Sequence, residues 1–106
     1  MTAIAVHYKI GDAILNKNEK TILCADGQKM PLTDLEIDVL TYLIEQNETP
    51  CDKDALLKDV WKYQTDVTTH TVETHIYRLR QKLPFLQNHL QTVEDGYVLI
   101  QHIEKV

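Results

Sequence analysis

Two arginines are the side chains of this 106-residue chain best suited to binding a partner. They are its only arginines, and both lie within residues 72–83. A guanidinium presents its donors in a planar fork that matches phosphate oxygens and the edge of guanine. Arg78 and Arg80 therefore indicate one binding element in this segment. The alternative, which applies to many charged helices, is that both are solvated surface groups.

The segment that carries the arginines has the pattern of an amphipathic helix that begins at Thr68 or Thr69 and ends before Pro84. At about 100° per residue, one narrow stripe is apolar and must face a core. This stripe consists of Val72, Ile76, Leu79 and Leu83. The opposite side carries His70, Thr74, Arg78 and Gln81, with Thr71 beside them. Tyr77 and Arg80 lie toward one flank, and His75 and Lys82 toward the other.

The formal net charge of -5 argues against a nucleic-acid partner when the chain is taken as a whole. The acidity is concentrated in residues 1–61, which hold six lysines against eleven carboxylates, whereas residues 62–106 are balanced. Between residues 67 and 83 the balance is +2, and His70 and His75 can add to it. Because physiological salt screens charges over about 8 Å, this local balance matters most. The sequence thus permits nucleic-acid binding here and predicts weak nonspecific affinity.

The residue patterns of catalysis and metal binding are missing from this sequence. No Ser/His/Asp or Cys/His order stands out, and a glycine-rich phosphate loop is absent. His70 and His75 are five residues apart and do not share a helix face well, so we expect no metal and no cofactor. Cys24 and Cys51 lack CxxC spacing and are predicted to be free thiols. Without a membrane-spanning run or a leader pattern, we expect a soluble cytoplasmic protein that is not an enzyme.

An antiparallel sheet is predicted over residues 6–32, ahead of the helices. Runs rich in Ile, Leu and Tyr at residues 8–15 and 21–25 are separated by turn-forming residues 16–18. Asp26 and Gly27 then offer a tight hairpin turn. Because a single hairpin is marginally stable in water, this sheet must pack against helices.

Three helices are predicted over residues 33–83, and a hairpin over residues 90–101. Thr33 and Glu36 form a capping box for the first helix, which runs to about Asn47. The second helix opens at Cys51 or Asp52, and the third carries the arginines. Residues 90–93 and 97–100 bracket a Glu-Asp-Gly turn at 94–96, which is a good hairpin signal. We therefore expect residues 1–106 to form a single domain.

The sequence resembles the OmpR/PhoB-type DNA-binding domain of bacterial response regulators. The segments that carry the resemblance are Thr33-x-x-Glu36, Leu56-Leu57-x-x-Val60-Trp61, residues 71–83, and Thr92-Val93 followed by Gly96-Tyr97-Val98-Leu99. They occur in order and span essentially the whole chain. The resemblance implies an α+β fold, a winged helix-turn-helix with an N-terminal antiparallel sheet, three helices and a C-terminal β-hairpin wing.

The resemblance also implies sequence-specific binding of double-stranded DNA by a transcription regulator of a two-component system, with the third helix in the major groove. Carried over by position, Thr74 and Arg78 would face base edges. The residues implied to contact phosphates or their surroundings are Trp61, His70, Thr71, His75, Tyr77 and Arg80. Trp61 also fits a core position, and Tyr97 fits packing at the base of the wing. The loop at residues 62–67, from Lys62 to Val67, is similar to the polymerase-contacting loop of activators, and we expect dimers on tandem half-sites.

Three features depart from the family pattern. The wing turn carries Glu94 and Asp95 where arginines are common, so its contact with the minor groove is not expected. Tyr77 stands where an arginine is frequent. The usual N-terminal receiver domain is missing from this sequence, and Met1 fits either a single-domain protein or a fragment. The acidic first half and wing favour an alternative, a winged-helix protein–protein interaction module with weak or no DNA binding.

Overall fold

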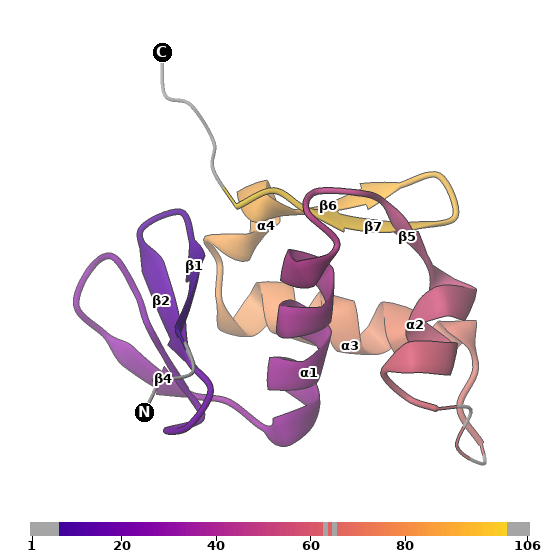
Figure 1. Ribbon diagram of the computed structural model, residues 1–106, viewed down its shortest axis with the longest axis horizontal. Coiled ribbons are helices and arrows are strands. Elements are labelled where there is room, and N and C mark those ends of the chain that lie inside the picture. The colour runs from indigo at the N-terminus through magenta and orange to yellow at the C-terminus, as the bar shows by residue number, and fades with distance from the viewer. Residues whose placement is uncertain (1–6, 63, 65, 102–106) are drawn as a thin grey trace, which may run out of the picture.

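The structure is a computed structural model that describes residues 7–62, 64 and 66–101. It has the predicted α+β architecture, with an N-terminal sheet, helices and a C-terminal hairpin wing (Figure 1). The elements are β1 (His7–Ile10), β2 (Ala13–Asn16), β3 (Thr21–Leu23), β4 (Lys29–Pro31), α1 (Asp34–Glu45), β5 (Cys51–Asp52), α2 (Lys53–Asp59), α3 (Thr69–Lys82), α4 (Leu86–His89), β6 (Leu90–Val93) and β7 (Gly96–Leu99). None of the helices described here has the length and apolar character needed to cross a membrane.

The N-terminal sheet is an antiparallel meander in the order β1-β2-β3-β4, which confirms the predicted sheet. Residues 8–15 form two strands, because Gly11 turns the chain with a φ of +59°. One cross-strand row, Tyr8-Leu15-Ile22-Met30, contributes to the hydrophobic core. The sheet therefore packs on the helices through a single face, as period-2 alternation requires.

The start of α1 is the predicted capping box. The Thr33 hydroxyl oxygen accepts a hydrogen bond from the Glu36 amide at 3.2 Å, and the Glu36 carboxylate accepts one from the Thr33 amide at 2.8 Å. The same carboxylate lies 2.9 Å from the ammonium of Lys82, at the end of α3. Helix α1 ends at Glu45, two residues before the predicted Asn47, because the chain turns to positive φ at Asn47. The cap thus joins the first helix to the third.

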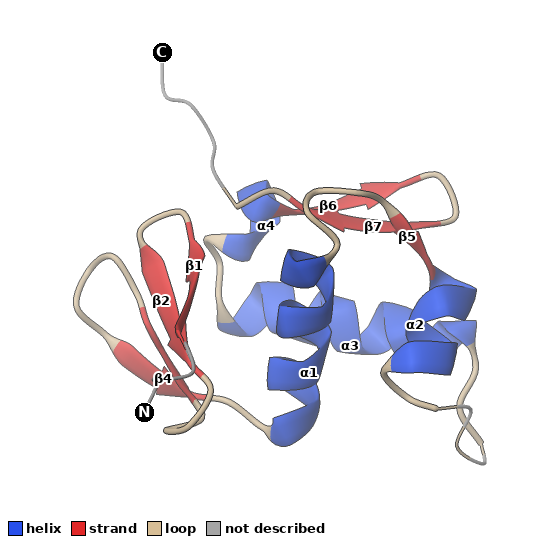
Figure 2. Ribbon diagram, in the orientation of Figure 1, coloured by secondary structure: helices blue, strands red, loops and turns tan. Residues whose placement is uncertain are grey.

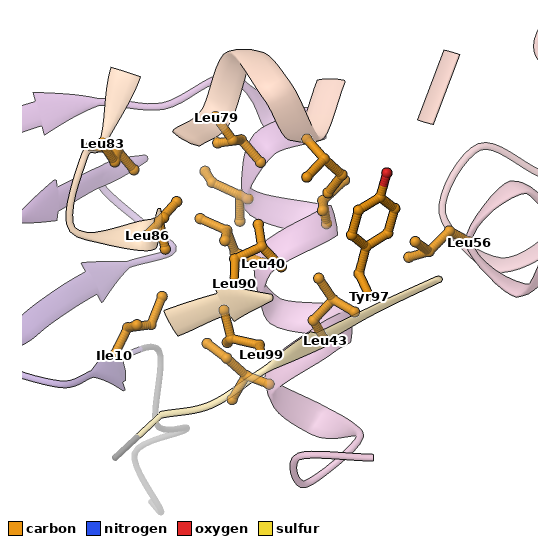
Figure 3. Packing of buried hydrophobic residues seen from close by; sticks show 14 of the residues in the cluster. Ile10, Leu40, Leu43, Leu56, Leu79, Leu83, Leu86, Leu90, Tyr97 and Leu99 are labelled. Atoms are coloured by element: carbon orange, nitrogen blue, oxygen red, sulfur yellow. The ribbon is translucent and has the colours of Figure 1, made fainter. Parts of the chain in front are cut away.

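The apolar stripe of α3 lies in the core, as its spacing predicted. Val72, Ile76, Leu79 and Leu83 are each at most 1% exposed. In Figure 3, Leu79 lies above Leu40 of α1 and Leu90 of β6, and Leu83 lies beside Leu86; Leu43 and Leu99 belong to the same core cluster. Helix α3 begins after Thr68 and ends before Pro84, as expected, and Asp52 is the N-cap of α2, accepting from the Ala55 amide at 2.7 Å.

The wing belongs to a three-stranded sheet in the order β5-β7-β6, which lies on a different flank of the helices from the N-terminal sheet (Figure 2). The turn is formed by Glu94 and Asp95, with Asp95 at a φ of 65°. Gly96, predicted as a turn residue, is instead the first residue of β7 and pairs with Asp52. A Cβ at this position would collide with the carbonyl oxygen of Cys51. The glycine therefore allows β5 to approach β7.

The Glu36 contacts predict a pH-dependent contribution to stability. Burial opposes its ionisation, but hydrogen bonds from Thr33 and Lys82 outweigh this and hold the pKa of the carboxyl below its ordinary 4.5. A lowered carboxyl pKa gives stability that is present above the unfolded pKa and is lost as pH falls through the folded one. We expect Glu36→Gln to lower the free energy of unfolding by about 1 kcal/mol near neutral pH.

Urea denaturation at about pH 7 and about pH 3 measures this difference, which should shrink at the lower pH because the wild-type carboxyl is then increasingly protonated. Glu45→Gln, at the exposed far end of α1, is the matched control and should not be destabilised. An equal loss for Glu36→Gln at both pH values would contradict the assigned role of the charge.

Candidate nucleic-acid interface

Helix α3 presents a polar face because its apolar stripe is buried. His70, Tyr77 and Arg78 are exposed, and Tyr77 is 63% exposed although it is a large aromatic side chain. Thr74, one turn before Arg78, is partly exposed on the same side. In Figure 1 this helix passes behind α1, with the wing strands above it and α2 beside its start. The predicted base-contacting pair, Thr74 and Arg78, thus lies together on an accessible helix face.

Arg78 forms no ion pair within the described part of the chain. Other charges of the helix are engaged: Lys82 pairs with Glu36 at 2.9 Å, and Glu73 pairs with Lys53 at 3.3 Å. The local balance of +2 is unchanged by these two pairs, since one neutralises Lys82 and the other neutralises Glu73, and the charges that remain are those of Arg78 and Arg80. The guanidinium of Arg78 remains for a partner outside this set of residues.

Thr74 is partly engaged within its own helix. Its hydroxyl donates to the carbonyl oxygen of His70 at 3.0 Å, a common arrangement for threonine in a helix. The oxygen lone pairs and the methyl group remain for outside contacts. Threonine at a base edge can therefore accept a hydrogen bond or pack on the methyl group of thymine.

Arg80 is bound to the wing. Its Nε–H and Nη2–H donate to the carbonyl oxygen of Leu90 at 2.9 and 2.6 Å, and Nη2–H also donates to the Thr92 hydroxyl oxygen at 3.0 Å. The guanidinium carbon lies 5.7 Å from the ring centroid of Tyr97, within cation–π range. Burial lowers the pKa of Arg80, although a guanidinium stays protonated at physiological pH. Arg80 therefore links the end of α3 to β6, a role that the sequence did not predict; its phosphate contact stays a prediction.

Trp61 and Tyr97 are both buried, at 3% and 4% exposure. The predicted core position of Trp61 is confirmed, and the ring of His75 lies against it edge-on, with centroids 5.4 Å apart. Burial raises the pKa of Tyr97, which packs at the base of the wing as predicted. The indole has little exposed surface that a phosphate could reach. The contact predicted for Trp61 stays a prediction.

Thr71, another predicted contact residue, makes a hydrogen bond within the first turn of α3. The Thr71 hydroxyl oxygen accepts from the Thr68 amide at 3.1 Å, and the side chain is half-buried. This bond satisfies one amide at the helix start, where several backbone donors otherwise lack partners. The hydroxyl hydrogen of Thr71 remains for a phosphate, whereas its oxygen is partly used.

The wing tip is acidic in space as well as in sequence. Glu94 and Asp95 are exposed, and the Asp95 carbonyl accepts from the Lys53 amide at 3.1 Å, which holds the tip against the start of α2. Asp52, Asp54 and Asp95 line a shallow depression together with Lys53 and Thr69. These carboxylates would repel phosphates, which strengthens the expectation that this tip does not enter a minor groove.

The link between Arg80 and the wing gives a stability prediction. Arg80→Ala removes charge-assisted hydrogen bonds to Leu90 and Thr92, so we expect the free energy of unfolding to fall by about 2 kcal/mol. Amide exchange in β6 should accelerate as well. Arg78→Ala, two residues away and exposed, is the matched control and should stay within about 0.5 kcal/mol of wild type. Equal stability of the two variants in urea denaturation would contradict the link.

Comparison with known proteins gives consistent matches. The family described as "Transcriptional regulatory protein, C terminal" matches residues 27–99. The regulatory protein VanRB of Enterococcus faecalis is 34% identical over 98 residues, which cover 92% of this chain and 43% of that protein. The DNA binding domain of E. coli CadC has a TM-score of 0.77 at 25% identity, covering 92% of this chain and 94% of that one. The Klebsiella pneumoniae RstA DNA-binding domain, solved in complex with the RstA box, has a TM-score of 0.73 at 26% identity, covering 91% and 98%.

The match extends over the sheet, the helices and the wing described above. The chain spans less than half the length of the Enterococcus relative, with 43% of that protein covered. The family segment, residues 27–99, begins in the N-terminal sheet and ends with β7, so it includes the polar face of α3 and the whole wing. The chain therefore belongs to the family of transcriptional regulatory protein C-terminal domains, the OmpR/PhoB-type winged helices that its sequence resembles.

Proposed function

We propose that this domain binds double-stranded DNA sequence-specifically and regulates transcription, as the effector domain of a bacterial response regulator. The observation that carries the proposal is the accessible polar face of α3, on which Arg78 lacks an ion-pair partner among the described residues. An α-helix fits the major groove, where each base pair presents a distinct pattern of donors and acceptors. Family membership and the RstA domain, which was solved with its DNA box, support the same function.

The proposed contacts divide by exposure and chemistry. Thr74 and Arg78 would meet base edges, with Arg78 able to make a bidentate contact to guanine. His70 and Tyr77 are exposed and can donate hydrogen bonds to phosphate oxygens. Contacts of this kind fix the position of a protein along the DNA duplex. The remaining proposed phosphate contacts are His75, Thr71 and Arg80, which are half-buried, and Trp61, which is buried. Arg80 would combine a phosphate contact with its link to the wing.

The partners beyond DNA are proposals too. The loop at residues 62–67 would contact RNA polymerase; positions 63 and 65 lie outside the described residues. A domain with a net charge of -5 should bind a single site weakly, so two copies on tandem half-sites would supply affinity. We propose a cytoplasmic binding role without catalysis, as expected for a domain of this family.

A second function is favoured by the acidic wing tip. Glu94 and Asp95, together with Asp52 and Asp54, form a surface that suits a basic protein better than DNA. In this alternative, the winged helix is a protein–protein interaction module. Salt-dependent enrichment of DNA sites at low ionic strength separates the two functions, because only the DNA-binding one requires it.

Selection of bound sites from a random DNA library tests the proposal, with Arg78→Ala as the variant. We expect the wild type to enrich one motif, and Arg78→Ala to lose about 1–3 kcal/mol of discrimination at one guanine position because the bidentate contact is removed. Lys58→Ala, which removes an exposed cation from α2, is the control and should leave the motif unchanged. An unchanged motif with Arg78→Ala would show that another element contacts the bases.

A further inference from the structure

We propose that His70 and His75 make DNA binding by this domain respond to pH, with the affinity rising as the two imidazoles take up protons. The inference rests on the proposed DNA-binding function and adds a regulatory input to it. Histidine is the side chain whose charge ordinarily changes between about pH 5 and about pH 8. A fall in pH would therefore change the charge of the face that meets DNA while the apolar stripe of α3 stays in the core.

Both histidines lie on the part of α3 that remains outside the core. His70 is exposed in the first turn, on the side that carries Thr74 and Arg78, and His75 is half-buried on the neighbouring flank. A neutral imidazole donates from one ring nitrogen and accepts with the other, whereas an imidazolium donates from both. Protonation thus supplies a second donor as well as a positive charge, and both favour contact with a phosphate oxygen.

The charge of this segment is small enough for two protons to matter. Residues 67–83 carry a net charge of +2 with neutral histidines and +4 when both histidines are protonated. Arg78 and Arg80 contribute the same charge throughout, because a guanidinium does not titrate in this range. Protonation therefore doubles the net positive charge of the segment. It also takes the whole chain, with its five histidines, from a formal charge of -5 to zero, so the local effect needs a control histidine elsewhere.

The ring of His70 is available to a partner. Within the described part of the chain it forms no ion pair or hydrogen bond, and only the His70 carbonyl is engaged, by the Thr74 hydroxyl. The charged groups that face this turn of α3 are Glu73, which pairs with Lys53 at 3.3 Å, and the carboxylates of Asp52, Asp54 and Asp95, which line a depression with Thr69. At about 100° per residue, Thr69 and Glu73 lie on one side of His70, and Thr74 and Arg78 on the other. The side of Thr74 therefore remains for a phosphate.

The ring of His75 is held in place by an uncharged neighbour. It lies edge-on against Trp61, with centroids 5.4 Å apart, and it has no ion-pair partner among the described residues. The charged groups of the surrounding elements are Lys58 in the last turn of α2, Lys62 and Asp66 in the segment that follows, and Arg78 on α3 itself. A ring that is already fixed by packing loses little freedom when it contacts a phosphate, so most of the effect of its charge is available to binding.

Affinity for the site selected from random DNA, measured at about pH 7.5 and about pH 5.5 at constant ionic strength, tests the inference. We expect wild-type binding to tighten by about 25-fold at the lower pH, about fivefold from each histidine, because each proton is bound more tightly in the complex than in the free protein. His70→Gln and His75→Gln should each keep a gain of about fivefold, and the double variant a gain below about twofold. His7→Gln removes an exposed histidine of β1, away from α3, and should keep the full gain.

His70→Arg fixes the charge at this position and separates the role of the charge from that of the ring. This variant should bind more tightly than wild type at about pH 7.5 and gain only about fivefold at about pH 5.5, because His75 alone then titrates. The salt slope is an independent readout, since each added cation–phosphate contact contributes about 0.9. It should steepen by about 1–2 on acidification of the wild type and stay constant in the double glutamine variant. Circular dichroism at both pH values shows that each protein is folded.

The outcomes separate this inference from the function on which it rests. A gain on acidification that is lost in the double variant and kept in His7→Gln supports the two histidines as its source. Specific binding that changes by less than about twofold in the wild type, or an equal gain in the wild type and the double variant, overturns the inference and leaves the DNA-binding function intact. An equal loss of the gain in His7→Gln and His70→Gln overturns it as well, because the response would then follow the charge of the whole chain. Failure to enrich any DNA site at either pH overturns both the inference and the function.

Discussion

The burial of one apolar stripe on α3 determines what the rest of this molecule presents to a partner. Val72, Ile76 and Leu79 enter the core at no more than 1% exposure, so the residues half a turn away must face outward. The N-terminal sheet, α1 and the wing strands all contribute side chains to that core. Because the stripe fixes the rotation of the helix about its own axis, it also fixes that Arg78 is accessible and that Arg80 lies against the wing.

The second organising feature is how the positive charges are distributed in space. Several of the cations of this acidic chain make contacts inside the fold. Lys82 forms an ion pair with Glu36 of the α1 cap, Lys53 forms one with Glu73, and Arg80 donates hydrogen bonds to the wing. These contacts link α1 to α3, α2 to α3, and α3 to β6. They also leave Arg78 as the free cation of α3 within the described residues. The two arginines thus differ in the structure: Arg80 is hydrogen-bonded to the wing, and Arg78 is exposed and available for the proposed contact with DNA.

The features predicted from sequence are those with local causes. The capping box at Thr33 and Glu36, the stripe of α3 and the Glu94-Asp95 turn each follow from residues within about one or two turns of one another, and all three are present. Strand β5 and helix α4 have two and four residues, too few to show a period. The Lys82–Glu36 pair spans 46 residues and the Arg80–Leu90 link depends on how the wing packs, so neither leaves a local pattern. The role of Gly96 could not be predicted for the same reason, because the backbone of Cys51, which leaves no space for a Cβ at Gly96, belongs to a strand far away in the sequence.

We propose above all that the outer face of α3 enters the major groove and that Arg78 contacts a guanine there. Methylation protection on the selected site measures this directly, since dimethyl sulfate reacts with guanine N7 in the major groove, the atom that a bidentate arginine covers. We expect the wild type to protect one guanine N7 in each half-site, and Arg78→Ala to lose this protection at protein concentrations that still saturate the DNA. Protection of the same guanines by wild type and Arg78→Ala alike would contradict it.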